Sequence, residues 1–175
     1  MGGAKATPSD NRNKRMSLKA TTKHSFMSYT NLVYHIVFRT YHSESTIVES
    51  HERELYAYIY GFCKNNGAKL YRIGGMPDHL HLLVSIPPTF AVAEFMRLLK
   101  RASSSWLKGN INFPLFKGWG QSYAAFTYSK NDIPMVKNYI MNQKCHHSSV
   151  TYEKELKEML ESEGVSFDER FFLKD

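Results

Sequence analysis

Two histidines separated by a single residue are the most chemically suggestive feature of this sequence. His79 and His81 flank Leu80 within the segment 77–84. Because side chains alternate along a β-strand, both imidazoles would project from one face while Leu80 projects from the other. Two imidazoles on one strand face supply half of a binding site for a divalent cation. Histidines that merely lie on a polar sheet face have the same spacing, so the pair alone leaves both interpretations open.

Tyr139 and Gln143 form a second candidate pair. They stand four residues apart in a segment with helical character, so one helix face would carry both side chains. A phenol with a pKa near ~10 is a weak nucleophile at neutral pH, but a cation that polarises a nearby phosphate lowers the barrier to its attack. The amide oxygen of Gln143 suits the same cation. An amphipathic helix with a packed tyrosine and a solvated glutamine is the alternative.

The charge of the chain favours a polyanionic partner without requiring one. Among 175 residues, 23 Lys and Arg outnumber 16 Asp and Glu, which gives a formal net charge of +7. A basic surface attracts the phosphates of nucleic acids, although basic charge also serves solubility alone. Four bases on one predicted helix are candidates for contacts with a nucleic-acid backbone: Arg97, Lys100, Arg101 and Lys108.

Hydrophobic periodicity predicts the elements that position these residues. Strands are expected at 32–38, 69–75, 79–86 and 123–128, and helices at 49–66, 89–108, 132–144 and 150–163. The order β-α-β-β-α-β followed by two helices is typical of an α+β, ferredoxin-like split βαββαβ antiparallel sheet with added C-terminal helices. Helices are expected to cover one face of the sheet, which leaves both imidazoles on the other face within reach of solvent.

Composition divides the chain into three parts. Residues 1–26 are basic and poor in aromatic side chains, which predicts a disordered extension; residues 27–150 form the core, and residues 151–175 form a charged C-terminal helix and tail. No apolar run approaches the ~18 residues of a membrane span, and we expect no secretory leader. Two cysteines do not make a disulfide framework, so reduced thiols and a cytoplasmic location are expected.

Together these segments resemble the single-tyrosine transposases of the HUH class, which include insertion-sequence transposases and REP-associated tyrosine transposases. That family carries histidine-hydrophobic-histidine on a central strand of a ferredoxin-like fold. It has one catalytic tyrosine on a later helix, with a glutamine or similar ligand one turn beyond. The similarity runs from Tyr29 to about Glu153 and is carried by four stretches: 29–39, 76–83, 119–126 and 139–143.

By position, the resemblance implies that Tyr139 is the nucleophile and that His79, His81 and Gln143 bind Mg²⁺ or Mn²⁺. It implies a metal-dependent transposase that nicks and rejoins single-stranded DNA with hairpin ends through a covalent 5′-phosphotyrosine intermediate. A homodimer that exchanges the tyrosine helix is expected, with no small-molecule cofactor and no membrane. The alternative is a domesticated relative that binds or nicks repetitive palindromes without transposition. A phosphoesterase with two H-x-S/T repeats is excluded, because the sequence lacks the hydroxyl residue and the second copy.

Overall fold

A four-stranded antiparallel sheet forms the centre of the molecule. The computed structural model describes residues 1–2, 29–146 and 150–175, so nearly all of the extension predicted at 1–26 lies outside the described residues. The strands are β1 (Val33–Arg39), β2 (Lys69–Met76), β3 (His79–Ser85) and β4 (Ala124–Tyr128). They pair in the order β2-β3-β1-β4, and every neighbouring pair is antiparallel. This strand order confirms the predicted ferredoxin-like α+β fold.

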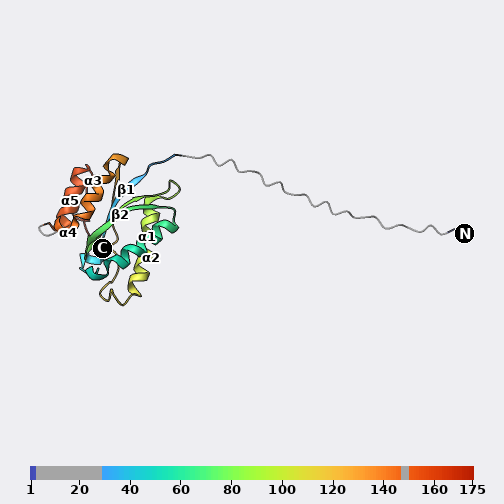
Figure 1. The fold of residues 1–175 in the computed structure, drawn as a ribbon, viewed down its shortest axis with the longest axis horizontal. Coiled ribbons are helices and arrows are strands. Elements are labelled where there is room, and N and C mark those ends of the chain that lie inside the picture. The colour runs from blue at the N-terminus through green and yellow to red at the C-terminus, as the bar shows by residue number, and fades with distance from the viewer. Residues whose placement is uncertain (3–28, 147–149) are drawn as a thin grey trace.

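Two long helices, α1 (Glu52–Asn65) and α2 (Val92–Lys108), cover one face of the sheet (Figure 1). The main hydrophobic core lies between them and the sheet, and it includes Phe38 of β1, Leu82 of β3 and Leu99 of α2, all fully buried. Because β1 and β3 are central strands with both faces covered, their sequences are nearly continuously apolar. Short 3-10 helices at Tyr41–Ser43 and Glu49–His51 precede α1, so the helix predicted from residue 49 begins three residues later.

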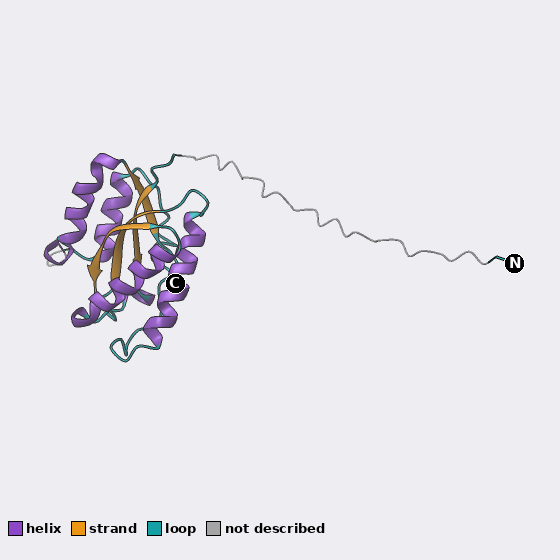
Figure 2. Cartoon of the chain, turned by 45° about the vertical axis from the view of Figure 1, so that its right-hand side comes forward, coloured by secondary structure: helices purple, strands orange, loops and turns teal. Residues whose placement is uncertain are grey.

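Three further helices lie against the opposite face, so helices flank the sheet on both sides (Figure 2). They are α3 (Ile133–Met141), α4 (Gln143–His146) and α5 (Tyr152–Ser162). Small apolar clusters hold them there: Leu83 of β3 packs with Ile140 of α3, and Val37 of β1 packs with Leu156 of α5. The prediction of helices on one face alone is therefore wrong. The division of the chain at residue 150 stays a prediction, although α5 itself packs on the sheet.

The connection from β4 to α3 directs the tyrosine helix onto the sheet. A short 3-10 helix, Lys130–Asp132, links the two, and Ser129 forms a reciprocal capping box with Asp132. The helix then passes very close to β2, because a Cβ atom built on Gly74 would lie 2.8 Å from the carbonyl oxygen of Ile140. The absence of a side chain at Gly74 thus permits the approach that brings Tyr139 to the sheet.

The helix predicted at 132–144 is interrupted. The first part ends at Met141, Asn142 departs from helical geometry with φ −93° and ψ 10°, and the second part begins at Gln143. The N–H of Asn142 donates to the carbonyl oxygens of Asn138 and Tyr139, which closes the first helix. Tyr139 and Gln143 therefore lie on successive short helices rather than one turn apart on one helix. None of the described helices is both long and apolar enough to cross a membrane.

Candidate metal and nucleophile site

His79 and His81 lie on the face of β3 that α3 and α5 cover. Both side chains are 0% exposed, so the expectation that solvent reaches them is wrong. The physical reason is α5, whose Tyr152 ring lies 4.7 Å from the His79 ring, centroid to centroid. The alternation predicted from the sequence is confirmed, because Leu80 projects into the core on the other side of the sheet.

Each of the two imidazoles is held through its Nδ1 atom. His79 Nδ1 lies 2.7 Å from Asp78 Oδ1, and His81 Nδ1 lies 3.0 Å from Nε2 of His35 on β1. Burial first, and then the charge of His81, lowers the pKa of His35 to about 3. A neutral His35 can accept the Nδ1 proton of His81, and Asp78 can accept that of His79. Both contacts therefore favour the tautomer that directs the Nε2 lone pairs of His79 and His81 away from these partners.

The Nε2 atoms of both histidines face the carboxylate of Glu155 on α5. Its Oε2 atom lies 3.5 Å from His79 Nε2 and 3.4 Å from His81 Nε2. The three side chains place one ligand atom each within 4.8 Å of one another, and all three are buried. This group could hold a metal ion, since two imidazole nitrogens and a carboxylate oxygen are ordinary ligands of a divalent cation.

The sequence analysis did not single out Glu155. The signal was present, because Tyr152, Glu155 and Leu156 follow the i, i+3, i+4 pattern of a buried helix stripe. A carboxylate at a position that the periodicity assigns to the interior needs a buried partner. Reading the helix as uniformly charged and solvated concealed this position.

Tyr139 reaches the same carboxylate. Its hydroxyl donates to Glu155 Oε1, and its ring lies 5.9 Å from that of His81 of the same chain, centroid to centroid. Burial, followed by the hydrogen bond to Glu155 and the charge of Glu155, raises the pKa of Tyr139 well above its usual range. Burial alone would raise the pKa of Glu155, but contacts with His81, Tyr139 and Gln143 outweigh it and hold that pKa well below its usual range.

Gln143 completes the group. The side chain is 1% exposed, and its amide nitrogen donates to Glu155 Oε1 over 2.9 Å. Its amide oxygen is buried and accepts no hydrogen bond from the described residues. An amide oxygen is a fitting ligand for Mg²⁺ or Mn²⁺ beside a carboxylate and two imidazoles. The structure thus brings all four predicted site residues together around a fifth, Glu155, and the metal role of Gln143 stays a prediction.

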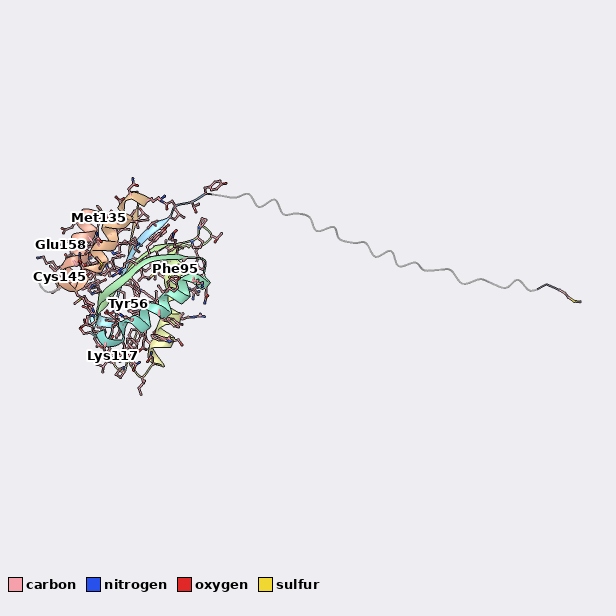
Figure 3. The ribbon with its side chains drawn as sticks, viewed as in Figure 1. Tyr56, Phe95, Lys117, Met135, Cys145 and Glu158 are labelled. Carbon is pink, nitrogen blue, oxygen red and sulfur yellow. The ribbon has the colours of Figure 1, made fainter. Side chains whose placement is uncertain are left out.

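Solvent approaches this group between α3 and α5. A cavity of about 300 Å³ opens there, and Tyr139 and Glu155 form part of its wall together with Met135 of α3 and Glu158 of α5. Figure 3 labels Met135 and Glu158 on these two neighbouring helices. The phenol and the carboxylate therefore border an open space, whereas the imidazoles lie behind them.

The four predicted DNA-contacting bases lie on α2, across the sheet from the histidines. Arg97 is exposed and pairs with Glu94, with 2.6 Å between Nη2 and Oε1. Lys100 donates to the backbone carbonyl oxygens of residues 120, 121 and 122 over 2.9, 3.1 and 2.7 Å, which gives it a structural role. Arg101 and Lys108 are exposed. The structure does not bring these bases to the metal and nucleophile site, and their contact with DNA stays a prediction.

Known proteins share most of this chain. The family model described as "Transposase IS200 like" matches residues 28–143. The ISDra2 transposase TnpA of Deinococcus radiodurans is 28% identical over 119 residues, which cover 64% of this chain and 84% of that protein. The transposase for insertion sequence element IS200 of Salmonella typhimurium is 28% identical over 118 residues, which cover 65% of this chain and 77% of that protein.

Two solved structures are similar as well. One, described as a transposase from Deinococcus radiodurans, gives a TM-score of 0.53 at 26% identity and covers 67% of this chain and 95% of its own. A REP-associated tyrosine transposase bound to a REP hairpin shares the fold, with a TM-score of 0.53 at 14% identity over 71% of this chain and 76% of its own. With its ferredoxin-like sheet, its histidine pair and a family match over residues 28–143, this chain belongs to the IS200-like transposase family.

Proposed function

We propose that this protein is a metal-dependent transposase that nicks and rejoins single-stranded DNA at insertion-sequence ends. The observation that carries the proposal is the convergence of a tyrosine hydroxyl and a buried two-histidine, one-carboxylate group on a single point. A phenol beside a cation site has the two components that phosphodiester cleavage through a covalent tyrosine needs. Family membership supports a DNA-processing enzyme in general.

In the proposed reaction Tyr139 is the nucleophile. Its oxygen forms a bond to the scissile phosphorus, the bond from phosphorus to the 3′-oxygen breaks, and the products are a 5′-phosphotyrosine and a free 3′-hydroxyl. Attack by another 3′-hydroxyl on the phosphotyrosine reverses these bonds and rejoins DNA without an external energy source. His79, His81 and Gln143 would hold Mg²⁺ or Mn²⁺, which supplies charge stabilisation at the scissile phosphate when bound.

The proposed partner is single-stranded DNA with hairpin ends. A related structure of the same fold holds a REP hairpin, which supports this class of substrate. Transposition joins two cleavages and two rejoinings, so two sites must act together, and a homodimer is the simplest closed assembly. Exchange of the tyrosine helix between protomers is part of this proposal, although within one chain Tyr139 already lies beside His81. The alternative function is that of a domesticated relative that binds or nicks repetitive palindromes without moving them.

The proposal is tested by substitution of the nucleophile. Tyr139→Phe is expected to abolish the covalent protein–DNA adduct, detected as a slow-migrating band with labelled hairpin DNA on a denaturing gel. The matched control is Tyr128→Phe, which removes a hydroxyl that borders the same cavity and donates to Glu163 over 2.8 Å. This control should keep the adduct, and both variants should bind the DNA within a few-fold of the parent. An adduct that persists in Tyr139→Phe assigns the nucleophile to another residue.

A further inference from the structure

A buried arginine adjoins the candidate metal site. Arg39 is the last residue of β1 and lies directly opposite His79 of β3 in the antiparallel register. Residues that face each other across antiparallel strands project from the same side of the sheet, so both side chains lie on the face under α5. Arg39 is 1% exposed. A guanidinium buried to this degree needs an anion against it.

The anion is a carboxylate from the C-terminal segment. Arg39 Nη1 donates to Asp175 Oδ2 over 2.6 Å, and Nη2 donates to the carbonyl oxygen of Leu173 over 2.6 Å. Two backbone N–H groups complete the cage: that of His42 donates to Oδ2 over 2.6 Å, and that of Gln121 donates to Oδ1 over 3.0 Å. A guanidinium together with converging backbone N–H groups is a chemistry that equally binds phosphate oxygens.

The pocket is built into the fold rather than formed by a chance surface contact. A Cβ atom on Gly120 would lie 2.9 Å from Asp175 Oδ1 and 3.1 Å from Arg39 Cγ, so the missing side chain makes room for the anion. Lys100 binds the carbonyl oxygens of residues 120–122 and thereby fixes the backbone that presents the N–H of Gln121. Arg39 Nε is buried and has no hydrogen-bond partner among the described residues, so the guanidinium keeps one unused donor.

We propose that Arg39 and the N–H groups of His42 and Gln121 form a phosphate pocket for the DNA strand that reaches His79. Asp175 occupies this pocket when DNA is absent, and a phosphate of the strand replaces it. A tetrahedral phosphate offers more acceptor oxygens than a carboxylate and can engage the Nε donor of Arg39 that Asp175 leaves unused. The inference rests on the proposed function, because the pocket adjoins the metal site at which that function places the strand.

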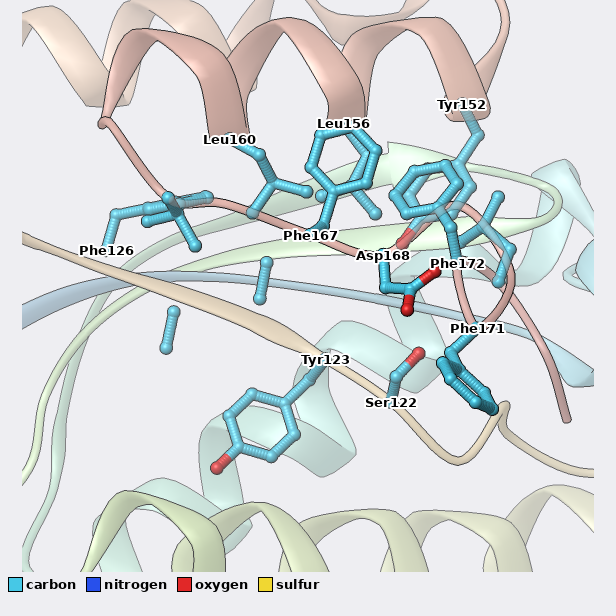
Figure 4. A pocket seen from close by; sticks show the side chains of 14 residues that line it. Ser122, Tyr123, Phe126, Tyr152, Leu156, Leu160, Phe167, Asp168, Phe171 and Phe172 are labelled. Carbon is cyan, nitrogen blue, oxygen red and sulfur yellow. The ribbon is translucent and has the colours of Figure 1, made fainter.

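The segment that carries Asp175 is held by apolar contacts that can be released. Phe172 and Leu173 are partly buried and pack against the cluster of Val37, Tyr152 and Leu156. A cavity of about 370 Å³ remains between this segment, α5 and β4, bordered by Phe172 and Tyr152 (Figure 4). The incomplete packing around this segment gives it room to move away from Arg39 when a phosphate competes.

Phosphate binding without DNA provides the first test. The Asp175→Asn variant keeps the size of the side chain and removes its charge, and calorimetry with inorganic phosphate in the presence of a chelator measures the freed pocket. We expect at least tenfold tighter phosphate binding than in the parent. The control Asp168→Asn, an exposed aspartate paired with Arg170 in the same segment, should match the parent. Adding Gly120→Ala to Asp175→Asn should return binding to the parent level, because the methyl group fills the pocket.

The second arm distinguishes a DNA phosphate from a free phosphate ion. Fluorescence anisotropy with hairpin-ended single-stranded DNA, over a series of salt concentrations and in chelator, should show tighter binding by Asp175→Asn. The slope of log affinity against log salt should steepen by about 0.7, the value for one additional contact to a single strand. Equal phosphate binding by Asp175→Asn and the parent overturns the pocket, and unchanged DNA affinity with phosphate bound overturns its assignment to DNA. Neither measurement involves cleavage, so a failed nucleophile test at Tyr139 would leave this result standing.

Discussion

The Glu155→Gln substitution tests whether the buried carboxylate holds the site together. Gln has the same shape, so its amide oxygen can still accept from Tyr139 and Gln143, but the charge is lost. A hydrogen bond to a charged group contributes about 1.5–3 kcal/mol and one to a neutral group about 0.5–1.5 kcal/mol, so two bonds lose roughly 2–3 kcal/mol. Relief of the buried charge offsets part of this loss. Because the pKa of Glu155 is lowered on balance, the favourable contacts win, and we expect a net destabilisation of about 1–3 kcal/mol.

The measurement is urea unfolding in chelator, so that bound cations do not contribute. At pH 7 the variant should unfold at lower urea with an unchanged slope, and its melting temperature should fall by about 3–10 °C. The matched control is Glu158→Gln on the same helix, an exposed side chain 3.9 Å from Lys154, for which we expect a change within about 0.5 kcal/mol.

The pH dependence fixes the sign of this effect. A carboxylate whose folded pKa is lowered contributes stability above its unfolded pKa, near ~4.3, and loses that contribution as the pH falls below it. The difference between the parent and Glu155→Gln should therefore shrink as the pH is lowered from about 5. A variant at least as stable as the parent at pH 7 would refute the reasoning, because burial of the charge would then outweigh the contacts that it makes.

Four further outcomes are expected. Mn²⁺ should raise the melting temperature of the parent but not of His79→Ala or His81→Ala, and cleavage should cease in excess chelator; because both imidazoles are buried, each substitution should also cost about 1–3 kcal/mol of stability. A mixture of Tyr139→Phe and His79→Ala proteins should recover cleavage if protomers exchange the tyrosine helix, and no recovery from a proven heterodimer would make the arrangement within one chain the working one. Gly74→Ala should destabilise the fold by about 1–3 kcal/mol and weaken adduct formation, because its methyl group would push α3 away from β2. Burial opposes ionisation of Asp175, but the N–H of His42 and the guanidinium of Arg39 lower its pKa, so the stability advantage of the parent over Asp175→Asn should be lost as the pH falls below about 4 in a urea titration.

The local features of the site could be predicted because they follow from periodicity. Alternation placed His79 and His81 on the face opposite Leu80, and the order of strands and helices indicated the ferredoxin-like sheet. Helix spacing brought Tyr139 and Gln143 to one place, although the break at Asn142 was not foreseen. Nothing in the local sequence distinguishes an asparagine inside a helix from one that ends it, since the turn depends on how α4 then packs.

The enclosure of the site could not be predicted, because it depends on contacts between distant elements. Burial of the histidines requires α3 to cross β2 at Gly74 and α5 to return over β1, and neither docking leaves a periodic signature. Glu155 entered the site through that return. The Arg39 contact with Asp175 spans even more of the chain, and one arginine at the end of a strand gives no sequence sign of its partner.

The zero exposure of His79 and His81 sets a kinetic and energetic condition on the substrate. A phosphodiester cannot touch imidazoles that α5 encloses, so the state that accepts DNA is one in which this helix has swung out or locally unfolded. The apparent dissociation constant then equals the intrinsic one divided by the fraction of molecules that are open, and every ~1.4 kcal/mol of closing energy weakens binding tenfold. Few apolar side chains fasten α5 to the sheet, so its amide protons should exchange with solvent far faster than those of β1 and β3. Substitutions that loosen this helix would then accelerate DNA capture while lowering the stability of the fold.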